Sequence, residues 1–231
     1  MILVRKAAER GVANFGWLQS KHSFSFGHYY DPKHMGFSAL RVINDDHVAP
    51  SAGFETHGHR DMEIISYVLK GEIAHKDSEG NVQVLPAGEF QLMSAGRGIF
   101  HSEFNNSAHD ALAFLQIWVE PNIKGTVPGY QQKNFGTTEG ITTIVTPDGE
   151  GSTLQIKQDA KLHQLILTAG KGLDFDRSIG EHVYIHVIQG ELLVNETLLQ
   201  AGDGAKVSQL KNMQLKNKGE TQVTALIFEL P

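Results

Sequence analysis

The chain has 231 residues, with 20 Lys and Arg against 26 Asp and Glu, and a formal net charge of −6. This balance provides no basic surface for nucleic-acid phosphates, so direct binding of DNA or RNA is not expected. The chain contains no cysteine, which excludes disulfides, thiolate nucleophiles and cysteine zinc sites, so any metal must be held by His, Asp or Glu. The apolar start, residues 1–4, is too short for a signal peptide or a membrane span, and a soluble, cytoplasmic protein is predicted.

Short apolar runs separated by turn-forming residues follow one another along the chain. In order they include FSALRVI (37–43), EIISYVL (63–69), FLQIWVE (114–120), TLQIKQ (153–158), VYIHVIQ (183–189) and TALIFEL (224–230). Their lengths and β-branched content predict strands, and the clusters DPKHMG (31–36) and DSEGN (77–81) predict loops between them. Helical periodicity is weak, with short candidates only at 4–10 and 107–113. The pattern predicts an all-β fold.

An internal repeat divides these strands into two sets. SYVLKGEI (66–73) aligns with IHVIQGEL (185–192), which places Gly71 on Gly190, and LPAGEF (85–90) resembles LQAGDG (199–204). A segment with two prolines and two glycines, residues 120–135, suits a connection between domains. We therefore expect two tandem antiparallel β-barrels, one over residues 1–125 and one over 126–231.

Two pairs of polar residues in the first repeat have the spacing of neighbours on one face of a strand. In a strand, side chains at i and i+2 point to the same side, so His57 and His59 form one such pair, and His101 and Glu103 form another. If the two strands face each other across a narrow barrel, three imidazoles and a carboxylate meet. That donor set suits one divalent transition metal with one or two open positions. The second repeat has no equivalent residues, so a single site is predicted.

The glycines around these pairs carry a resemblance to a known family. H57-G-H59-x3-E63-x7-G71 resembles the first motif of the cupin superfamily, and G88-x12-H101-x3-N105 resembles the second. Within the cupins, the segments HSFSFGHYYDPKHMGFSALRVINDD (22–46), HGHRDMEI, MSAGRGIFHSEFN and LQIWVEP resemble the pirin family, especially bacterial members with quercetinase-type activity. The resemblance is specific over the N-terminal half and loose over the C-terminal half.

The resemblance implies a bicupin with one metal ion in the first barrel, held by His57, His59, His101 and Glu103. General cupins use the glutamate of the first motif instead, which here is Glu63, so both carboxylates are candidates. We favour Glu103 because pirins use the HxE pair, and because a bulge after the first histidine pair would shift the register of Glu63. Family resemblance favours Fe(II), while the donor set also accepts Cu, Mn, Co, Ni or Zn.

The remaining histidines are expected to have structural or surface roles. His22, His28 and His34 lie in the N-terminal segment that resembles pirins. His22 could approach the pocket but is interpreted as a hydrogen-bonded structural residue. Surface positions are predicted for His47, His75, His109 and His163, and no second metal site is expected from His182 and His186. Apolar residues near the motifs are assigned to the core, with some of them available to line an aromatic pocket: Phe24, Phe26, Phe54, Met93 and Phe100.

Two classes of function are consistent with these residues. The resemblance implies a metal-dependent dioxygenase that cleaves a flavonol such as quercetin with O2 and releases carbon monoxide, with Glu103 as the general base for the 3-hydroxyl. The alternative is a redox-sensing regulatory protein that binds a partner through its metal-containing surface without physiological catalysis. A monomer with no nucleic-acid or membrane partner is predicted in either case.

Overall fold

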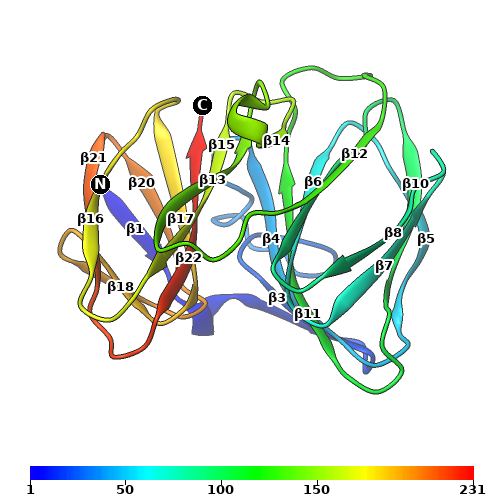
Figure 1. Ribbon diagram of the computed structural model, residues 1–231, viewed down its shortest axis with the longest axis horizontal. Coiled ribbons are helices and arrows are strands. Elements are labelled where there is room, and N and C mark those ends of the chain that lie inside the picture. Colours follow the sequence, from blue (N-terminus) through cyan, green and yellow to red (C-terminus); the bar gives the residue numbers. More distant parts are fainter. The chain divides into compact units, whose positions relative to one another are not determined.

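The protein is built almost entirely from β-strands. The computed structural model describes residues 1–231, in which the helical elements are two single 3-10 turns, η1 (Ala7–Glu9) and η2 (Glu150–Ser152) (Figure 1). Neither turn is long enough to cross a membrane. The all-β prediction is confirmed. The expected helix at 4–10 is reduced to η1, and the one at 107–113 is absent because a strand begins at Leu112.

The first of two compact units contains residues 11–136 and 156–158. It has two antiparallel sheets (Figure 1). The larger sheet has, in spatial order, β12 (Gly129–Asn134), β9 (Glu89–Ser94), β6 (Glu63–Lys70), β11 (Leu112–Val119), β4 (Leu40–Val48), β3 (Leu18–His22) and β2 (Gly11–Asn14). The smaller sheet has β5 (Gly53–His59), β10 (Ile99–Asn105), β7 (Glu72–Asp77) and β8 (Val82–Pro86).

The second unit contains residues 1–10, 137–155 and 159–231 and repeats this plan. Its larger sheet has β1 (Ile2–Arg5), β20 (Gly204–Ser208), β17 (His182–Gln189), β22 (Val223–Leu230), β15 (Lys161–Leu167), β13 (Gly140–Thr146) and β14 (Leu154–Gln155), and the short β14 runs parallel to β13. Its smaller sheet has β16 (Gly172–Asp176), β21 (Asn212–Asn217), β18 (Glu191–Val194) and β19 (Thr197–Gln200).

The units differ in their limits from the expected ranges 1–125 and 126–231. The first ten residues belong to the second unit because β1 pairs with β20. The segment expected to be a connection contains β12, which pairs with β9, so the first unit extends to Gly136. Strand pairing, which composition does not reveal, sets both limits.

The glycines of the sequence repeat have the same conformation in both units. Gly71 and Gly190, each following the long strand, have φ angles of 79° and 81°. Gly88 and Gly202 have φ angles of 88° and 83°. These left-handed values favour glycine, and a Cβ at Gly190 would lie 2.7 Å from the carbonyl oxygen of Gln222. The repeat is therefore visible in the backbone as well as in the sequence.

The interior of the first unit is apolar at both ends and polar in the middle. One apolar cluster includes Val68, Ile73 and Leu112, and another includes Ile64, Met93 and Ile99. Between them, directly paired residues of five neighbouring strands form a polar row, and all of its members are buried: Gln91, Ser66, Gln116, Asn44 and His22. Buried amides and hydroxyls cost free energy unless they are paired, so this row marks the part of the barrel that folding alone does not explain.

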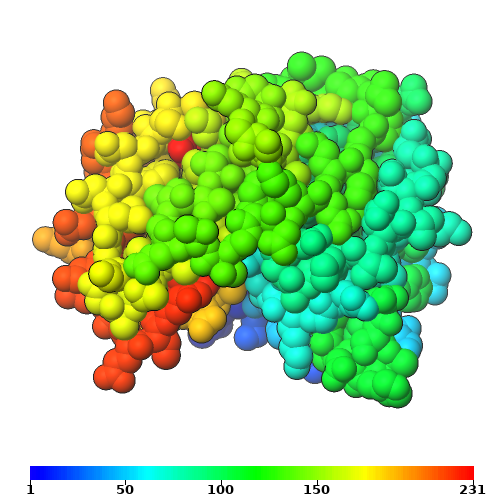
Figure 2. Space-filling view, in the orientation of Figure 1, coloured from blue at the N-terminus to red at the C-terminus, as the bar shows by residue number.

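The surface of the first unit brings together segments that are distant in sequence. In the space-filling view, the cyan segments that follow residue 60 lie against green segments beyond residue 100 (Figure 2). Phe100 has 61% of its area exposed, so its assignment to the core is wrong. On β10 the side chains alternate, and because Ile99, His101 and Glu103 point inward, Phe100 points outward. Phe24 and Met93 are buried as expected.

Candidate metal centre

The two predicted pairs of polar residues lie on neighbouring strands of the smaller sheet. β5 carries His57 and His59, and β10 carries His101 and Glu103. The strands run antiparallel with His101 directly opposite His57, and their register shifts between His101 and Glu103. The i, i+2 spacing therefore places each pair on one face of its strand, as expected. The two strands were expected to face each other across the barrel, but they are neighbours in one sheet.

The three imidazoles converge on a single point. The ring centres of His57 and His101 are 4.5 Å apart, and His59 lies 4.8 Å and 4.9 Å from them. One donor atom from each of the three lies within 4.8 Å of the others. The Nε2 atoms of His57 and His101 are 3.1 Å apart, close to the separation of about 3.0 Å for two nitrogens bound at right angles to one ion with bonds of about 2.1 Å.

A hydrogen bond to Nδ1 of His57 leaves its Nε2 available to a metal. Its Nδ1 lies 2.7 Å from the carbonyl oxygen of Glu55, which can only accept, so Nδ1 carries the proton and donates it. The Nε2 lone pair is then free for a metal, which is the usual arrangement for a metal-binding histidine. No protein group is hydrogen bonded to Nδ1 of His101, which is buried.

Glu103 is held from the opposite sheet by two members of the polar row. Its Oε1 accepts from the Ser66 hydroxyl at 3.3 Å, and its Oε2 accepts from the Gln116 amide at 2.9 Å. The carboxylate is 2% exposed and has an oxygen within 4.8 Å of donor atoms of His75 and His101. The polar row thus orients the carboxylate beside the imidazoles.

Glu63 lies outside this cluster. It follows a tight turn at residues 60–62, where Asp61 has a φ of 63°. Its Oε2 accepts from the Ser94 hydroxyl at 2.9 Å and from the backbone N–H of Lys157 at 3.2 Å. The Glu63 carboxylate therefore ties β6 to β9 and to the 156–158 segment, and it belongs to neither group of metal-type donors.

The prediction that His75 lies at the surface is wrong. His75 is 1% exposed, lies on β7 directly opposite Glu103, and its Nε2 is 3.2 Å from Oδ2 of Asp77. Its ring centre is 5.4 Å from that of His101. The sequence contained a signal for this residue, since His75 and Asp77 have the same i, i+2 spacing as the two recognised pairs.

Burial keeps two imidazoles of the cluster, those of His59 and His101, neutral. Removal from water, followed by the proximity of His57, lowers the pKa of His101 to about 3. Burial and then the neighbouring His101 and His57 lower the pKa of His59 to about 4. The pKa of Glu103 is raised, chiefly by burial. Neutral imidazole is the form that binds metals, so three nitrogens and one carboxylate fit a divalent transition metal.

Among the other histidines, one differs from expectation and three agree with it. His163 is buried rather than exposed, and its Nε2 lies 2.8 Å from Oε1 of Glu229. His47 and His109 are exposed as predicted. His22 is buried and its Nδ1 lies 2.7 Å from Oδ1 of Asn44, in agreement with a structural role. Two groups of side chains could hold a metal, and both lie in the first unit. One is His57, His59 and His101, and the other is His75, His101 and Glu103.

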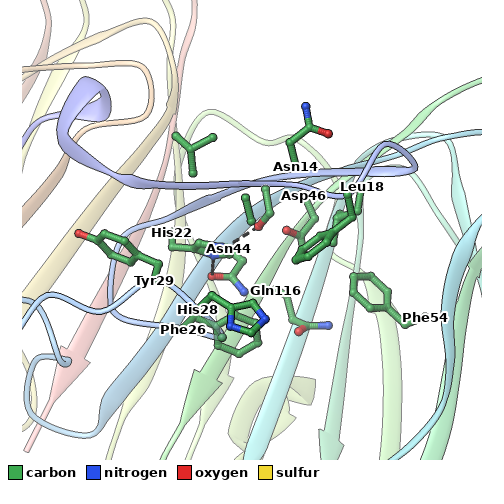
Figure 3. A pocket seen from close by; sticks show the side chains of 15 residues that line it. Asn14, Leu18, His22, Phe26, His28, Tyr29, Asn44, Asp46, Phe54 and Gln116 are labelled. Carbon is green, nitrogen blue, oxygen red and sulfur yellow. Dashed lines mark hydrogen bonds between the residues drawn. The ribbon is translucent and has the colours of Figure 1, made fainter.

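A cavity of about 570 Å³ opens at the larger sheet of the same unit (Figure 3). Its walls come from β2, β3, β4, β5, β11 and the segment 22–29. Two wall residues also touch the imidazole and carboxylate cluster. Gln116 donates to Glu103, and the ring of Phe54 lies 6.4 Å from that of His57. The cavity is therefore next to the candidate metal centre, with Gln116 and Phe54 shared between them.

Two related β-barrels in one chain, with three imidazoles and a carboxylate gathered in the first, define a two-domain cupin. Residues 4–119 match the family model described as Pirin, and residues 143–230 match the model described as Quercetinase C-terminal cupin domain. The chain belongs to the pirin family.

The similarity to individual relatives extends over the full chain. Quercetin 2,3-dioxygenase of Escherichia coli strain K12 is 43% identical over 231 residues, covering 100% of this chain and 99% of the relative. The crystal structure of the bacterial pirin YhhW from Escherichia coli in complex with nickel(II) superimposes with a TM-score of 0.95 at 42% identity, covering 100% of this chain and 99% of that one. A quercetin 2,3-dioxygenase from Acinetobacter baumannii, at 22% identity and a TM-score of 0.76, shares the fold.

Proposed function

We propose that this protein is a metal-dependent quercetin 2,3-dioxygenase, which cleaves a flavonol with O2 and releases carbon monoxide. The observation that carries the proposal is the convergence of His57, His59 and His101 beside the buried Glu103, in a chain that matches a bacterial quercetin 2,3-dioxygenase along its whole length.

The metal that we propose is Fe(II), held by His57, His59, His101 and Glu103. A bound ion of this kind supplies Lewis acidity toward the flavonol oxygens and a redox partner for O2. The donor set also accepts copper, manganese, cobalt, nickel or zinc. Iron is favoured by the family resemblance, and the metal content of protein purified from its natural source would identify the native ion.

The residues of the chain have distinct roles in this proposal. Glu103 accepts the proton of the flavonol 3-hydroxyl, and Ser66 and Gln116 fix the direction of its two oxygens. The carbonyl of Glu55 keeps Nε2 of His57 unprotonated. Trp118, whose ring lies 5.0 Å from that of His59, supplies an apolar wall that limits water beside the imidazoles.

A direct assay tests the proposal. Iron-loaded protein mixed with quercetin is expected to bleach the visible absorption of the flavonol while dissolved O2 falls in step. His101→Ala is expected to abolish both changes, and His109→Ala, at an exposed position, is expected to preserve them. Unchanged O2 in the presence of several flavonols would reject the activity. A cytoplasmic location and a monomeric state stay predictions of the sequence.

A further inference from the structure

The cavity beside the candidate metal centre has an apolar body and one polar side. Its apolar lining includes the rings of Phe26, Tyr29 and Phe54, and its polar side carries His22, Asn44 and Asp46 (Figure 3). A volume of about 570 Å³ is within the range of small-molecule pockets, which typically combine apolar walls with a few placed polar groups. This composition suits a flat aromatic ring that bears a hydroxyl group.

One polar atom on that side has no partner in the protein. Asp46 is 2% exposed, and its Oδ1 receives no hydrogen bond. The Ser20 hydroxyl is hydrogen bonded to the carboxyl group of Asp46. Burial raises the pKa of Asp46 to about 7, so the group is a carboxylate above that pH. A buried acceptor without a donor costs roughly 1 to 3 kcal/mol, so Oδ1 at the cavity wall favours a ligand that donates a hydrogen bond.

The neighbouring polar groups are engaged with one another or with Glu103, and none of them is hydrogen bonded to Oδ1 of Asp46. Nδ1 of His22 is engaged with Oδ1 of Asn44 at 2.7 Å and with the Ser20 hydroxyl at 3.3 Å. The Gln116 amide donates to Glu103 and accepts from the indole N–H of Trp118 at 3.3 Å. Asp46 is therefore the acceptor left to a molecule in the cavity.

We propose that this cavity binds the phenyl ring carried at carbon 2 of the flavonol, and that Asp46 accepts a hydrogen bond from a hydroxyl group of that ring. The inference rests on the proposed function and adds the determinant of substrate choice. The phenyl ring is joined to the rest of the flavonol by one bond, so it can enter the cavity while the 3-hydroxyl stays beside Glu103. A site that pairs with a substrate hydroxyl rejects the analogue that lacks it.

The test measures binding in the absence of O2, which separates it from catalysis. Dissociation constants are determined by fluorescence titration of the metal-loaded protein with galangin, kaempferol and quercetin, which carry none, one and two hydroxyls on this ring. The wild type is expected to bind kaempferol or quercetin about tenfold tighter than galangin. Asp46→Ala is expected to remove that preference while leaving galangin affinity within about twofold.

Two further variants make the result specific. Asp46→Asn retains an acceptor oxygen and is expected to recover part of the preference, which a merely structural role of Asp46 would not predict. Asp45→Ala, one residue along β4 on the opposite face, is expected to keep the full preference. Equal loss of affinity for all three flavonols in Asp46→Ala, or an unchanged preference, would overturn the role of Asp46. Absence of flavonol binding to the wild type would instead reject the proposed function on which it rests.

Discussion

Glu103 and Glu63 are buried carboxylates of the same barrel that are held in different ways. Glu103 accepts from side chains of Ser66 and Gln116 and lies beside the imidazoles, whereas Glu63 accepts from Ser94 and from a backbone N–H. Burial raises the pKa of both carboxyl groups. Only the carboxylate of Glu103 has metal-type donors around it.

Substitution by glutamine, which preserves shape and removes charge, separates their roles. Glu103→Gln is expected to weaken metal retention by at least about tenfold, because a negatively charged ligand is lost. Glu63→Gln is the matched control and is expected to retain metal while lowering the melting temperature. Elemental analysis after dialysis against a weak chelator measures both. The reverse order would assign the carboxylate ligand to Glu63, as in general cupins.

His75 supports the cluster from the neighbouring strand. It lies between Asp77 and Glu103, and its buried ring leaves little room for Glu103 and His101 to move. His75→Gln is expected to weaken metal affinity about 10- to 100-fold without removing a ligand, as outer partners of metal sites commonly do. His109→Gln, at an exposed position, should leave the affinity unchanged. An unaltered metal dissociation constant in His75→Gln would show that the ring is only packing.

At the scale of elements, the site depends on how closely β5 approaches β10. Gly53 faces Glu103 and Phe104, and a Cβ there would lie 2.4 Å from the carbonyl oxygen of Glu103 and 2.5 Å from Cα of Phe104. Backbone atoms cannot move aside as a side-chain tip can. The glycine at this position is therefore what allows the carboxylate strand to lie beside the histidine strand.

Gly53→Ala is expected to lower the free energy of unfolding by about 1 to 3 kcal/mol through overpacking and to weaken metal binding as β10 shifts. Gly129→Ala, in β12, is a suitable control because a Cβ at Gly129 would meet nothing within 4 Å. Thermal melts and metal titrations report the two effects. Full metal affinity in a destabilised Gly53→Ala would mean that the close approach serves folding alone.

Strand periodicity predicted part of this site, and strand pairing supplied the rest. The spacing of His57 with His59, and of His101 with Glu103, is local information and was sufficient to group them. The place of His75 depends on the pairing of β7 with β10, and the contacts of Glu103 depend on side chains from the opposite sheet. The position of Glu63 outside the donor cluster likewise depends on the turn at 60–62, which the spacing of residues does not specify.

At the scale of the whole molecule, the two barrels share a plan and differ in chemistry. Both metal-type groups lie in the first unit, and the second unit has instead a buried pair formed by His163 and Glu229. Purified protein is therefore expected to hold one metal ion per chain. Elemental analysis should find about one equivalent in the wild type and a strong loss in His57→Ala. A second equivalent that survives this substitution would require a site in the other barrel.

Asp203 binds the start of the chain to the second barrel. Its carboxylate should make the stability of this barrel sensitive to acid. Its carboxylate accepts from Nζ of Lys6 at 2.9 Å, and from the backbone N–H groups of Ala7 at 2.7 Å and Gln200 at 3.0 Å. Burial raises its pKa, but these hydrogen bonds outweigh burial, and the net pKa is below the ordinary 3.8.

Because the folded pKa of Asp203 is depressed, its contribution to stability is present above about pH 4 and is lost as pH falls through the folded pKa. At pH 7 the free energy of unfolding of Asp203→Asn is expected to be about 1 to 3 kcal/mol lower than that of the wild type. This difference in free energy of unfolding should shrink below pH 4. Chemical denaturation across this range measures the gap. Asp174→Asn, at an exposed position of β16, should show no such gap. A gap of constant size at all pH values would contradict the assignment.

The pairing of β1 with β20 also has a consequence for synthesis on the ribosome. The N–H of Ser208 is bonded to the carbonyl of Met1, across about two hundred residues of chain. At roughly 5 to 20 residues per second, β1 waits on the order of 10 to 40 s for its partner to be made. During that interval the barrel translated first can close, but the nascent chain exposes a strand edge of the kind that chaperones protect. The barrel that is translated second is thus completed by a strand that emerges before the other barrel.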